Sequence, residues 1–269
     1  MHNPDPSQAG GGHDPLQQLE WLVTALSNEP HTWALFLDID GTLIDLAPTP
    51  DTIVIPSSLP ANLKTISERL GGALALVTGR ALPYADELFR PYRFPIAGLH
   101  GSERRAANGS VERVAATAAF DEVKASLAAA AGEWPGVLIE DKGAAVAAHY
   151  RQAPEWCDEV EKAMGYYLLQ AGEDFTLQRG KMVFEIRPAH ADKGGALQAY
   201  LGEAPFQGRR PIAIGDDLTD EAMFKVANAL GGHSVRIGDT TLPDGTASQA
   251  TMFLSSAAKL RDILARLAR

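Results

Sequence analysis

Short, unbroken runs of apolar residues constrain the fold of this chain more than any other feature of its sequence. Residues 33–37 (WALFL) and 73–77 (ALALV) contain no polar side chain, and residues 212–214 (IAI) repeat the pattern. Strands that read this way are buried on both faces, as in parallel sheets covered by helices. Segments with helical spacing separate the runs, so we expect a doubly wound α/β core with a parallel sheet.

The remaining elements of this core follow from local patterns. Apolar residues at helical spacing predict helices at 15–28, 57–70, 193–201, 219–229 and from about 256 onward. Shorter apolar stretches predict strands near 94–97, 234–237 and 251–254. Thr78-Gly79-Arg80 is expected to open a helix directly after the second run. Residues 1–14, which are rich in Pro, Gly and polar residues, are expected to form a disordered tail.

The pattern changes in the middle of the chain. Asn108-Gly109 favours a tight hairpin turn, and a helix–hairpin–helix–hairpin order follows it. The expected elements are helices at 119–132 and 155–171 and strands at 137–141, 144–151, 174–179 and 182–187, with turns at Lys142-Gly143 and Gly180-Lys181. An antiparallel sheet with helices on one face is a different layer architecture. We therefore predict an inserted α+β cap domain at 111–188, a discontinuous core at 31–110 and 189–269, and an N-terminal helix at 15–30.

Composition excludes some classes of partner. The chain of 269 residues has 24 basic and 34 acidic residues and a net charge of −10, which argues against a broad nucleic-acid-binding surface. No apolar run approaches the roughly 20 residues that span a bilayer, and the N-terminus lacks the pattern of a signal peptide. The single cysteine, Cys157, cannot form an internal disulfide. We expect a cytoplasmic monomer with neither a nucleic-acid nor a membrane partner.

Two acidic residues lie where the first apolar run ends. Asp38 and Asp40 are followed by Gly41-Thr42, and in open α/β sheets ligands bind beyond the carboxyl ends of the strands. Like charges at this spacing raise a carboxyl pKa unless a cation offsets them. The alternative is a strand that simply ends in an acidic, capped turn.

Three further segments place polar side chains at strand ends or helix starts. Thr78-Gly79 directly follows the second apolar run, and Gly215-Asp216-Asp217 follows the third. Lys193 lies in the first turn of an expected helix, where a cation opposes the helix dipole unless a bound anion compensates it. Each segment has an ordinary alternative explanation. Thr78-Gly79 could be a capping turn, the acids after Gly215 could cap a helix, and Lys193 could be a solvated lysine.

Taken together, these residues suit phosphoryl transfer. One aspartate would attack phosphorus and the second would move the proton. The Thr78-Gly79 turn and Lys193 would hold the phosphate oxygens. Carboxylate oxygens without a His or Cys cluster suit Mg²⁺ rather than zinc, so Mg²⁺ is the expected cofactor.

The four segments also resemble, in order, the motifs of the haloacid dehalogenase superfamily of phosphatases: Asp38-x-Asp40-Gly-Thr42, Thr78, Lys193 and Gly215-Asp216-Asp217. The resemblance covers residues 33–268 and implies a Rossmann-like core of that type. It implies that Asp38 is the nucleophile, which forms an aspartyl-phosphate, and that Asp40 is the general acid and then the general base. It also implies that Mg²⁺ binds the Asp38 carboxylate, the Asp40 main-chain carbonyl and Asp216.

A narrower resemblance, to the bacterial trehalose-6-phosphate phosphatases, extends to the insert. It rests on the segments LDIDGTL at 37–43, VTGR at 77–80, GLHG at 98–101, GDDLTDE at 215–221, Glu140-x-Lys142-Gly, His149-Tyr150-Arg151 and VFEIRP at 183–188. The resemblance implies that Glu140, Lys142, Arg151 and Glu185 hydrogen-bond trehalose hydroxyls, and that His100 contacts the substrate. From the residues alone, charges that pair across a solvated sheet face explain the insert equally well.

The expected activity is Mg²⁺-dependent hydrolysis of trehalose 6-phosphate to trehalose and phosphate in trehalose biosynthesis. The expected partner is a small-molecule sugar phosphate, with a functional link to trehalose-6-phosphate synthase. One alternative is a phosphatase or mutase for another sugar phosphate, such as sucrose, mannose or glucosylglycerol phosphate. Another is a non-catalytic sugar-phosphate sensor, against which the retained Asp38, Asp40, Lys193 and Asp216 argue.

Overall fold

The computed structural model describes residues 15–46, 53–180 and 182–269. The tail expected at 1–14, and Lys181 of the turn expected at 180–181, lie outside these residues. The chain divides into two compact units, one formed by Met1–Val111 with Lys193–Arg269 and the other by Glu112–Asp192. None of the helices that the structure describes is long and apolar enough to cross a membrane.

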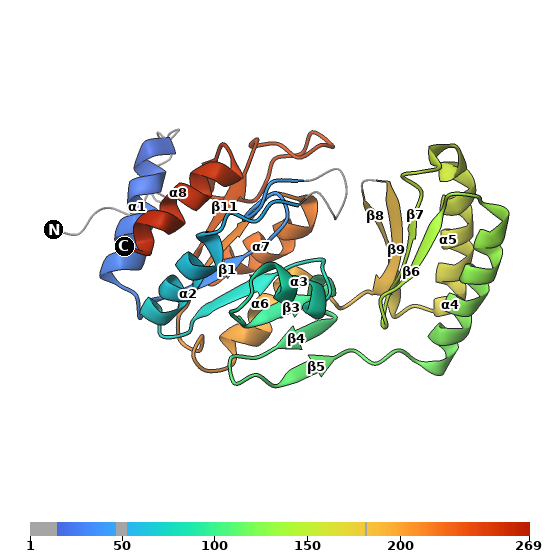
Figure 1. Ribbon diagram of the computed structural model, residues 1–269, viewed down its shortest axis with the longest axis horizontal. Coiled ribbons are helices and arrows are strands. Elements are labelled where there is room, and N and C mark those ends of the chain that lie inside the picture. The colour runs from blue at the N-terminus through green and yellow to red at the C-terminus, as the bar shows by residue number, and fades with distance from the viewer. Residues whose placement is uncertain (1–14, 47–52, 181) are drawn as a thin grey trace. The chain divides into compact units, whose positions relative to one another are not determined.

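The first unit is built on an eight-stranded sheet (Figure 1), although the last two residues of its edge strand β5 already belong to the second unit. Its strands are β1 (Trp33–Leu37), β2 (Leu74–Val77), β3 (Ile96–Gly98), β4 (Glu103–Arg105), β5 (Val111–Arg113), β10 (Arg210–Gly215), β11 (His233–Ile237) and β12 (Met252–Leu254). They are arranged in the order β12-β11-β10-β1-β2-β3-β4-β5. The pairs from β12 to β3 are parallel, and β4 is antiparallel to β3.

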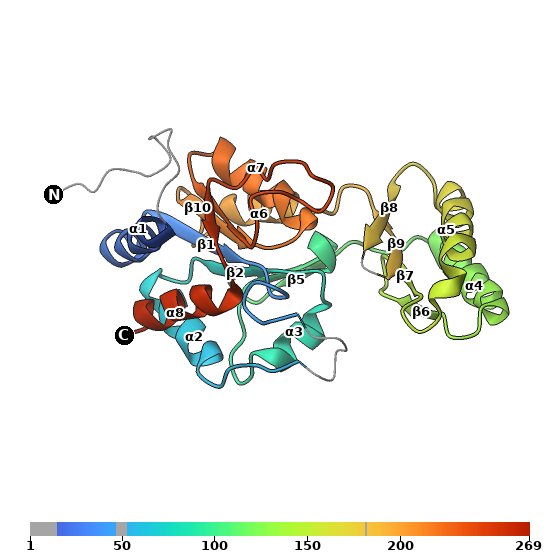
Figure 2. The same cartoon turned by 90° about the horizontal axis from the view of Figure 1, so that it is seen from above.

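Helices cover both faces of this sheet. They are α1 (Pro15–Asn28), α2 (Leu59–Arg69), α3 (Leu82–Leu88), α6 (Lys193–Leu201), α7 (Glu221–Ala229) and α8 (Ala257–Leu267). Helices α6 and α7 lie on one face, and α2, α3 and α8 lie on the other (Figure 2). Every residue of β1 is buried, as its unbroken apolar run requires. The expected doubly wound α/β core is confirmed.

One local expectation in this unit is wrong. Thr78-Gly79-Arg80 does not open a helix, because the Arg80 carbonyl accepts a hydrogen bond from the Leu99 amide at 3.0 Å and α3 begins only at Leu82. The hairpin turn expected at Asn108-Gly109 is confirmed, since the Ala106 amide donates a hydrogen bond to the Ser110 carbonyl at 2.9 Å. It joins strands β4 and β5, for which the sequence made no prediction. They are three residues long and largely polar, so they leave no apolar run to detect.

The second unit is a four-stranded antiparallel sheet with two helices on one face (Figure 1). Its elements are α4 (Ala118–Ala130), β6 (Leu138–Asp141), β7 (Val146–His149), α5 (Cys157–Ala171), β8 (Phe175–Gly180) and β9 (Val183–Pro188), with the strand order β6-β7-β9-β8. Val146, Phe184 and Ile186 belong to the apolar core that the sheet shares with α4 and α5. The alternate residues of each strand, Glu185 among them, therefore lie on the opposite face.

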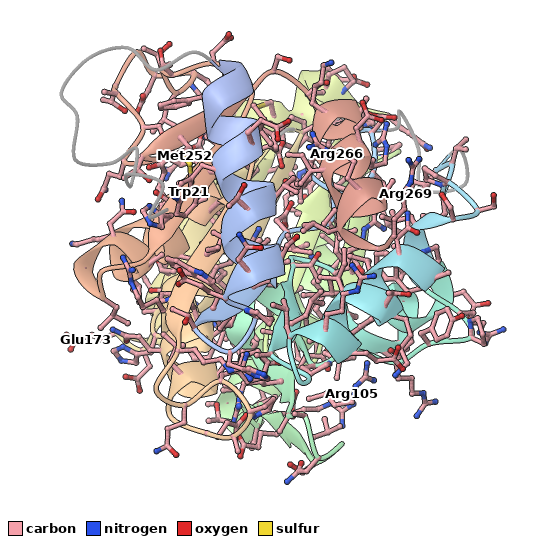
Figure 3. All side chains as sticks on the ribbon, turned by 90° about the vertical axis from the view of Figure 1, so that its left-hand side faces the viewer. Trp21, Arg105, Glu173, Met252, Arg266 and Arg269 are labelled. Carbon is pink, nitrogen blue, oxygen red and sulfur yellow. The ribbon has the colours of Figure 1, made fainter. Side chains whose placement is uncertain are left out.

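Helix α1 packs on the first unit beside α8 (Figure 3). Glu20 accepts hydrogen bonds from two guanidinium nitrogens of Arg266, at 2.8 and 3.0 Å. The Trp21 ring lies edge-on to the His233 ring, with 4.3 Å between their centroids, and 5.7 Å from the ring of Trp33. The expected helix at 15–28 therefore forms and joins the apolar core.

Candidate active site

Three polar side chains stand directly after neighbouring strands of the first unit. Asp38 follows β1, Thr78 follows β2 and Asp216 follows β10. Because β1 pairs in parallel with both β2 and β10, the three strands end at one edge of the sheet. Asp38 and Thr78 are buried there, and Asp216 is partly buried.

Lys193 joins this group from the first position of α6. Its Nζ donates hydrogen bonds to Oδ1 of Asp38 and to Oδ1 of Asp220, both at 2.6 Å. Burial alone would lower the pKa of Lys193, but the two carboxylates outweigh it and hold that pKa above its usual range. The side chain is only 3% exposed, so the alternative of a solvated lysine is wrong.

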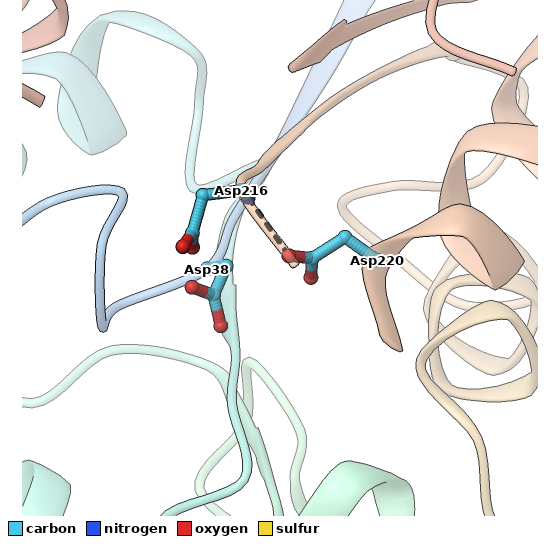
Figure 4. Close-up of side chains that lie close together, drawn as sticks. All are labelled: Asp38, Asp216 and Asp220. Carbon is cyan, nitrogen blue, oxygen red and sulfur yellow. Dashed lines mark hydrogen bonds between the residues drawn. The ribbon is translucent and has the colours of Figure 1, made fainter. Parts of the chain in front are cut away.

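Three carboxylates gather around this ammonium group. Each of Asp38, Asp216 and Asp220 offers an oxygen within 4.8 Å of the other two (Figure 4). Burial raises the pKa of Asp38 well above its usual range, against the opposing effect of Lys193. Burial, together with the charge of Asp220, raises the pKa of Asp216 to about 6. One ammonium group facing three carboxylates leaves an excess of negative charge in the site.

A tight turn brings Asp216 against the segment that follows β1. The Thr42 hydroxyl donates a hydrogen bond to Oδ1 of Asp216 at 3.0 Å. Gly41 has a φ of +80°, and a Cβ atom placed on it would lie 2.1 Å from Oδ2 of Asp216. Only glycine therefore permits this conformation and this close approach. The Gly-Thr sequence after the two aspartates thus shapes the site as well as ending the strand.

Asp40 has a different partner. Nε of Arg80 donates a hydrogen bond to Oδ2 of Asp40 at 2.6 Å, and a terminal nitrogen of the same guanidinium donates to Oδ1. The guanidinium also lies over the ring of Tyr84, 4.6 Å from its centroid. The Asp40 side chain is 32% exposed, whereas that of Asp38 is 6% exposed. Water therefore reaches the Asp40 carboxylate, whereas Asp38 is enclosed.

His100 lies beside the turn after β2. Its main-chain amide donates a hydrogen bond to the Thr78 carbonyl at 2.9 Å, and its φ is +56°. A Cβ atom on Gly79 would lie 2.7 Å from the His100 ring, so the glycine leaves room for the imidazole. The Thr78 hydroxyl accepts a hydrogen bond from the Arg80 amide at 3.2 Å. The predicted phosphate-binding turn and the predicted substrate residue are thus neighbours.

The donor set fits a hard divalent cation. All three clustered side chains are carboxylates, which are ligands that Mg²⁺ prefers, and the excess negative charge calls for a counter-ion. Both oxygens of Asp220 are already engaged, one by Lys193 and the other by the amides of Asp216 and Asp217 at 2.9 Å. Asp38 and Asp216 therefore remain as the side chains with a carboxylate oxygen to offer a metal.

Two residues of this site were not given a role by the sequence. Asp220 looked like one of several acids that cap a helix, and it does form a capping box with Asp217. Asp220 is also fully buried and accepts a hydrogen bond from Lys193. The one signal in the sequence is its position four residues after Asp216, at the start of the helix that follows the third apolar run. Arg80 stood in the quoted VTGR segment, but nothing in a one-dimensional pattern pairs it with Asp40.

The predicted sugar-binding residues lie in the second unit. Lys142 donates a hydrogen bond to Oε2 of Glu185 at 2.7 Å, and its Nζ is 3.9 Å from Oε2 of Glu140. Glu140 also contacts Nε2 of His149 at 2.8 Å, and this contact lowers the pKa of Glu140. Arg151 is exposed in the turn after β7. Cross-strand charge pairing, which the sequence left as the alternative, is therefore present for Lys142 and Glu185.

Comparison with known proteins bears on both units. A family model described as trehalose-phosphatase matches residues 36–258. The chain is 59% identical over 249 residues to a probable trehalose-phosphate phosphatase of Sinorhizobium fredii, covering 93% of this chain and 92% of that one. It is 44% identical over 207 residues to the trehalose-6-phosphate phosphatase of Escherichia coli, covering 77% of each.

Solved structures show the same fold at low sequence identity. The C-terminal domain of Candida albicans trehalose-6-phosphate phosphatase superposes with a TM-score of 0.75 at 20% identity, covering 92% of this chain and 95% of that domain. A phosphatase of the haloalkanoate (HAD) enzyme superfamily from Bacteroides thetaiotaomicron superposes with a TM-score of 0.58 at 19% identity, covering 88% and 96%. The doubly wound α/β fold with an inserted α+β unit is thus the fold of these solved phosphatases as well.

Proposed function

Since the chain belongs to the trehalose-phosphatase family, we propose that it hydrolyses trehalose 6-phosphate to trehalose and phosphate, with Asp38 as the nucleophile. The observation that carries the assignment of Asp38 is its burial beside Lys193 at the end of β1. Residues 155 positions apart in the chain meet there at 2.6 Å. A carboxylate and an ammonium group are held in an enclosed site that also accommodates a metal-binding carboxylate.

In the first step, a carboxylate oxygen of Asp38 forms a bond to phosphorus, and the bond between phosphorus and the sugar oxygen breaks. The leaving sugar oxygen takes a proton from Asp40, which is the more exposed of the two aspartates. Lys193 and the Thr78-Gly79 turn hold the remaining phosphate oxygens, where charge accumulates in the transition state.

In the second step, water attacks the phosphorus of the aspartyl-phosphate. Asp40, now without its proton, accepts one from this water, and the bond between phosphorus and Asp38 breaks. Phosphate leaves, and both aspartates regain their starting state. Arg80 holds Asp40 in the free protein, so this arginine must share or release that carboxylate when Asp40 donates its proton.

The carboxylates of Asp38 and Asp216 and the main-chain carbonyl of Asp40 would hold Mg²⁺. When bound, the ion would neutralise the excess negative charge of the carboxylates and of the phosphate. Thr42 orients Asp216 through its 3.0 Å hydrogen bond, and Asp220 orients Lys193. These two neighbours keep the Asp216 carboxylate and the Lys193 ammonium group in place before any ligand arrives.

Sugar recognition is assigned to the second unit and to His100. Glu140, Lys142, Arg151 and Glu185 offer charged donors and acceptors of the kind that bind sugar hydroxyls. The ion pair between Lys142 and Glu185 orients both side chains and leaves their other hydrogen-bonding positions for a ligand. The cytoplasmic location, the monomeric state and the link to the synthase stay predictions from the sequence.

The function is tested by phosphate release from a panel of substrates. We expect kcat/KM for trehalose 6-phosphate to exceed that for sucrose, mannose and glucosylglycerol phosphates by at least about 10²-fold, because each unmatched hydroxyl leaves buried polar groups unpaired. Free phosphate, with no phosphorylated sugar isomer among the products, would distinguish hydrolysis from mutase action. Equal rates across the panel would contradict the substrate assignment while leaving the phosphatase chemistry intact.

Metal removal is expected to stop turnover and to lower the melting temperature. Chelation by EDTA leaves the buried carboxylates without a counter-ion, and adding Mg²⁺ restores both properties because the ion binds the folded state only. Thermal melts with and without Mg²⁺ measure this effect independently of activity. The Asp216→Asn variant should lose the Mg²⁺-dependent increase in melting temperature. Its neighbour variant Asp217→Asn, which keeps a capping side chain, should retain it.

A further inference from the structure

Three buried polar atoms on one face of the second unit's sheet lack a partner among the residues that the structure describes. Oε1 of Gln178, Oε1 of Glu185 and Nε of Arg187 make no hydrogen bond with any part of the chain that the structure describes. The residues lie on the two neighbouring strands β8 and β9. Unpaired buried groups are uncommon in folded proteins, and three of them together call for an explanation.

The register places these residues side by side. Gln178 is directly opposite Glu185, and Thr176 is opposite Arg187, so Arg187 is the diagonal neighbour of Gln178. Directly opposite residues have Cβ atoms about 5 Å apart, and diagonal ones are about 7–8 Å apart. Since Phe184 and Ile186 face the helices, all three residues point away from α4 and α5.

Glu185 and Arg187 each make one hydrogen bond through another side-chain atom. Oε2 of Glu185 accepts the 2.7 Å hydrogen bond from Lys142, and a terminal nitrogen of Arg187 donates to the Ala191 carbonyl. Glu185 is only 6% exposed. These contacts orient the carboxylate and the guanidinium, whereas Oε1 of Glu185 and Nε of Arg187 stay without a partner among the described residues. The two side chains are thus oriented by other contacts, while each still has a polar atom without a hydrogen bond among the described residues.

The unused atoms have the chemistry of a sugar-binding site. Two acceptors, Oε1 of Gln178 and Oε1 of Glu185, belong to directly opposite residues of β8 and β9, and one donor, Nε of Arg187, belongs to the diagonal neighbour of Gln178. A sugar hydroxyl both donates and accepts a hydrogen bond. Neighbouring hydroxyls on one ring could donate to the two acceptors while one of them accepts from the guanidinium.

We propose that Gln178 is a further specificity-determining residue, which accepts a hydrogen bond from a sugar hydroxyl beside the one bound by Glu185. The inference deepens the proposed function and rests on it, because it presumes a sugar phosphate as the substrate. It adds to the set deduced from the sequence a residue that lies outside the motifs quoted there. Its role is to bind the sugar; Gln178 takes no part in the phosphoryl transfer.

The test compares Gln178→Ala and Gln178→Leu with Gln170→Ala. Gln170 is exposed on α5 of the same unit, so its variant is a matched control. We expect both Gln178 variants to lower kcat/KM for trehalose 6-phosphate by at least about 10-fold, the size of one lost buried hydrogen bond. Hydrolysis of p-nitrophenyl phosphate, which has no sugar, should stay within about twofold of wild type in all three variants.

Stability separates a binding role from a structural one. Gln178→Leu removes a buried acceptor that has no partner in the described part of the chain, so its melting temperature should equal or exceed that of the wild type. A fall in melting temperature that accompanies loss on both substrates would mean a structural role and would overturn the proposal. So would Gln178 variants that match Gln170→Ala on trehalose 6-phosphate.

Failure of the proposed function would look different. In that case the wild type itself would show no preference for trehalose 6-phosphate over the other sugar phosphates. The comparison of the variants would then be made on the preferred sugar ester, where a selective loss in Gln178→Ala would still support sugar binding. An unchanged rate on that ester would overturn the assignment of Gln178.

Discussion

Asp38→Asn is expected to reduce turnover by at least about 10⁴-fold, as loss of a nucleophile does in other covalent enzymes. The amide cannot form the acyl phosphate, although it nearly matches the carboxylate in shape. Burial raises the pKa of Asp38 well above its usual range, so the neutral side chain should be tolerated. Without Mg²⁺, the melting temperature of this variant should match or exceed that of wild type. Phosphate release and thermal melts measure the two effects.

The matched control is Asp45→Asn, in the same segment after β1. Asp45 is 74% exposed and pairs with Arg261, so its loss should leave turnover unchanged. If Asp38→Asn kept more than about one hundredth of the wild-type rate, Asp38 would not be the nucleophile. A sensor would bind trehalose 6-phosphate equally well with either residue and would show no turnover in the wild type.

Lys193→Met should damage both activity and stability. We expect kcat to fall by about 10²–10³-fold, because a charge aimed at the phosphate is lost. In EDTA the variant should also lose about 3–5 kcal/mol of unfolding free energy, because Asp38 and Asp220 remain buried without their counter-ion. Urea denaturation with and without Mg²⁺ measures the second effect, and Mg²⁺ should recover part of it.

A second substitution and a control keep this prediction testable. Adding Asp220→Asn to Lys193→Met removes one unpaired charge and keeps an acceptor for the Asp216 amide, so stability should improve without return of activity. Lys64→Met removes an exposed lysine that pairs with Glu68, and should change stability by less than about 1 kcal/mol. If the metal-free Lys193→Met variant were as stable as the wild type, the electrostatic account of the site would be wrong.

The core was predictable because strands that are buried on both faces consist of unbroken apolar residues. β1 and β2 are apolar throughout, and such runs admit few other interpretations. Once the strands are parallel, their ends share one edge, so Asp38, Thr78 and Asp216 must gather there. Geometry of this kind follows from topology and needs no knowledge of side-chain contacts.

The rest depends on contacts between residues distant in the chain. Arg80 reaches Asp40 from the turn after β2, a pairing that neither residue's local sequence indicates. Asp220 has a satisfactory local explanation as a capping residue, which conceals its contact with Lys193. Strands β4 and β5 are too short and too polar to be recognised before β3 is in place to pair with β4.

Gly41 has a consequence for how the protein can change over time. Even a methyl group at this position would overlap a carboxylate oxygen of Asp216, and the main chain already adopts a conformation disfavoured for every other amino acid. No substitution of Gly41 is therefore conservative, since even replacement by alanine would displace the Asp216 side chain, which is proposed to bind Mg²⁺. Under the proposed function, adaptation to other substrates would fall to the second unit, where an altered residue would redirect sugar recognition without disturbing the residues proposed to cleave the ester.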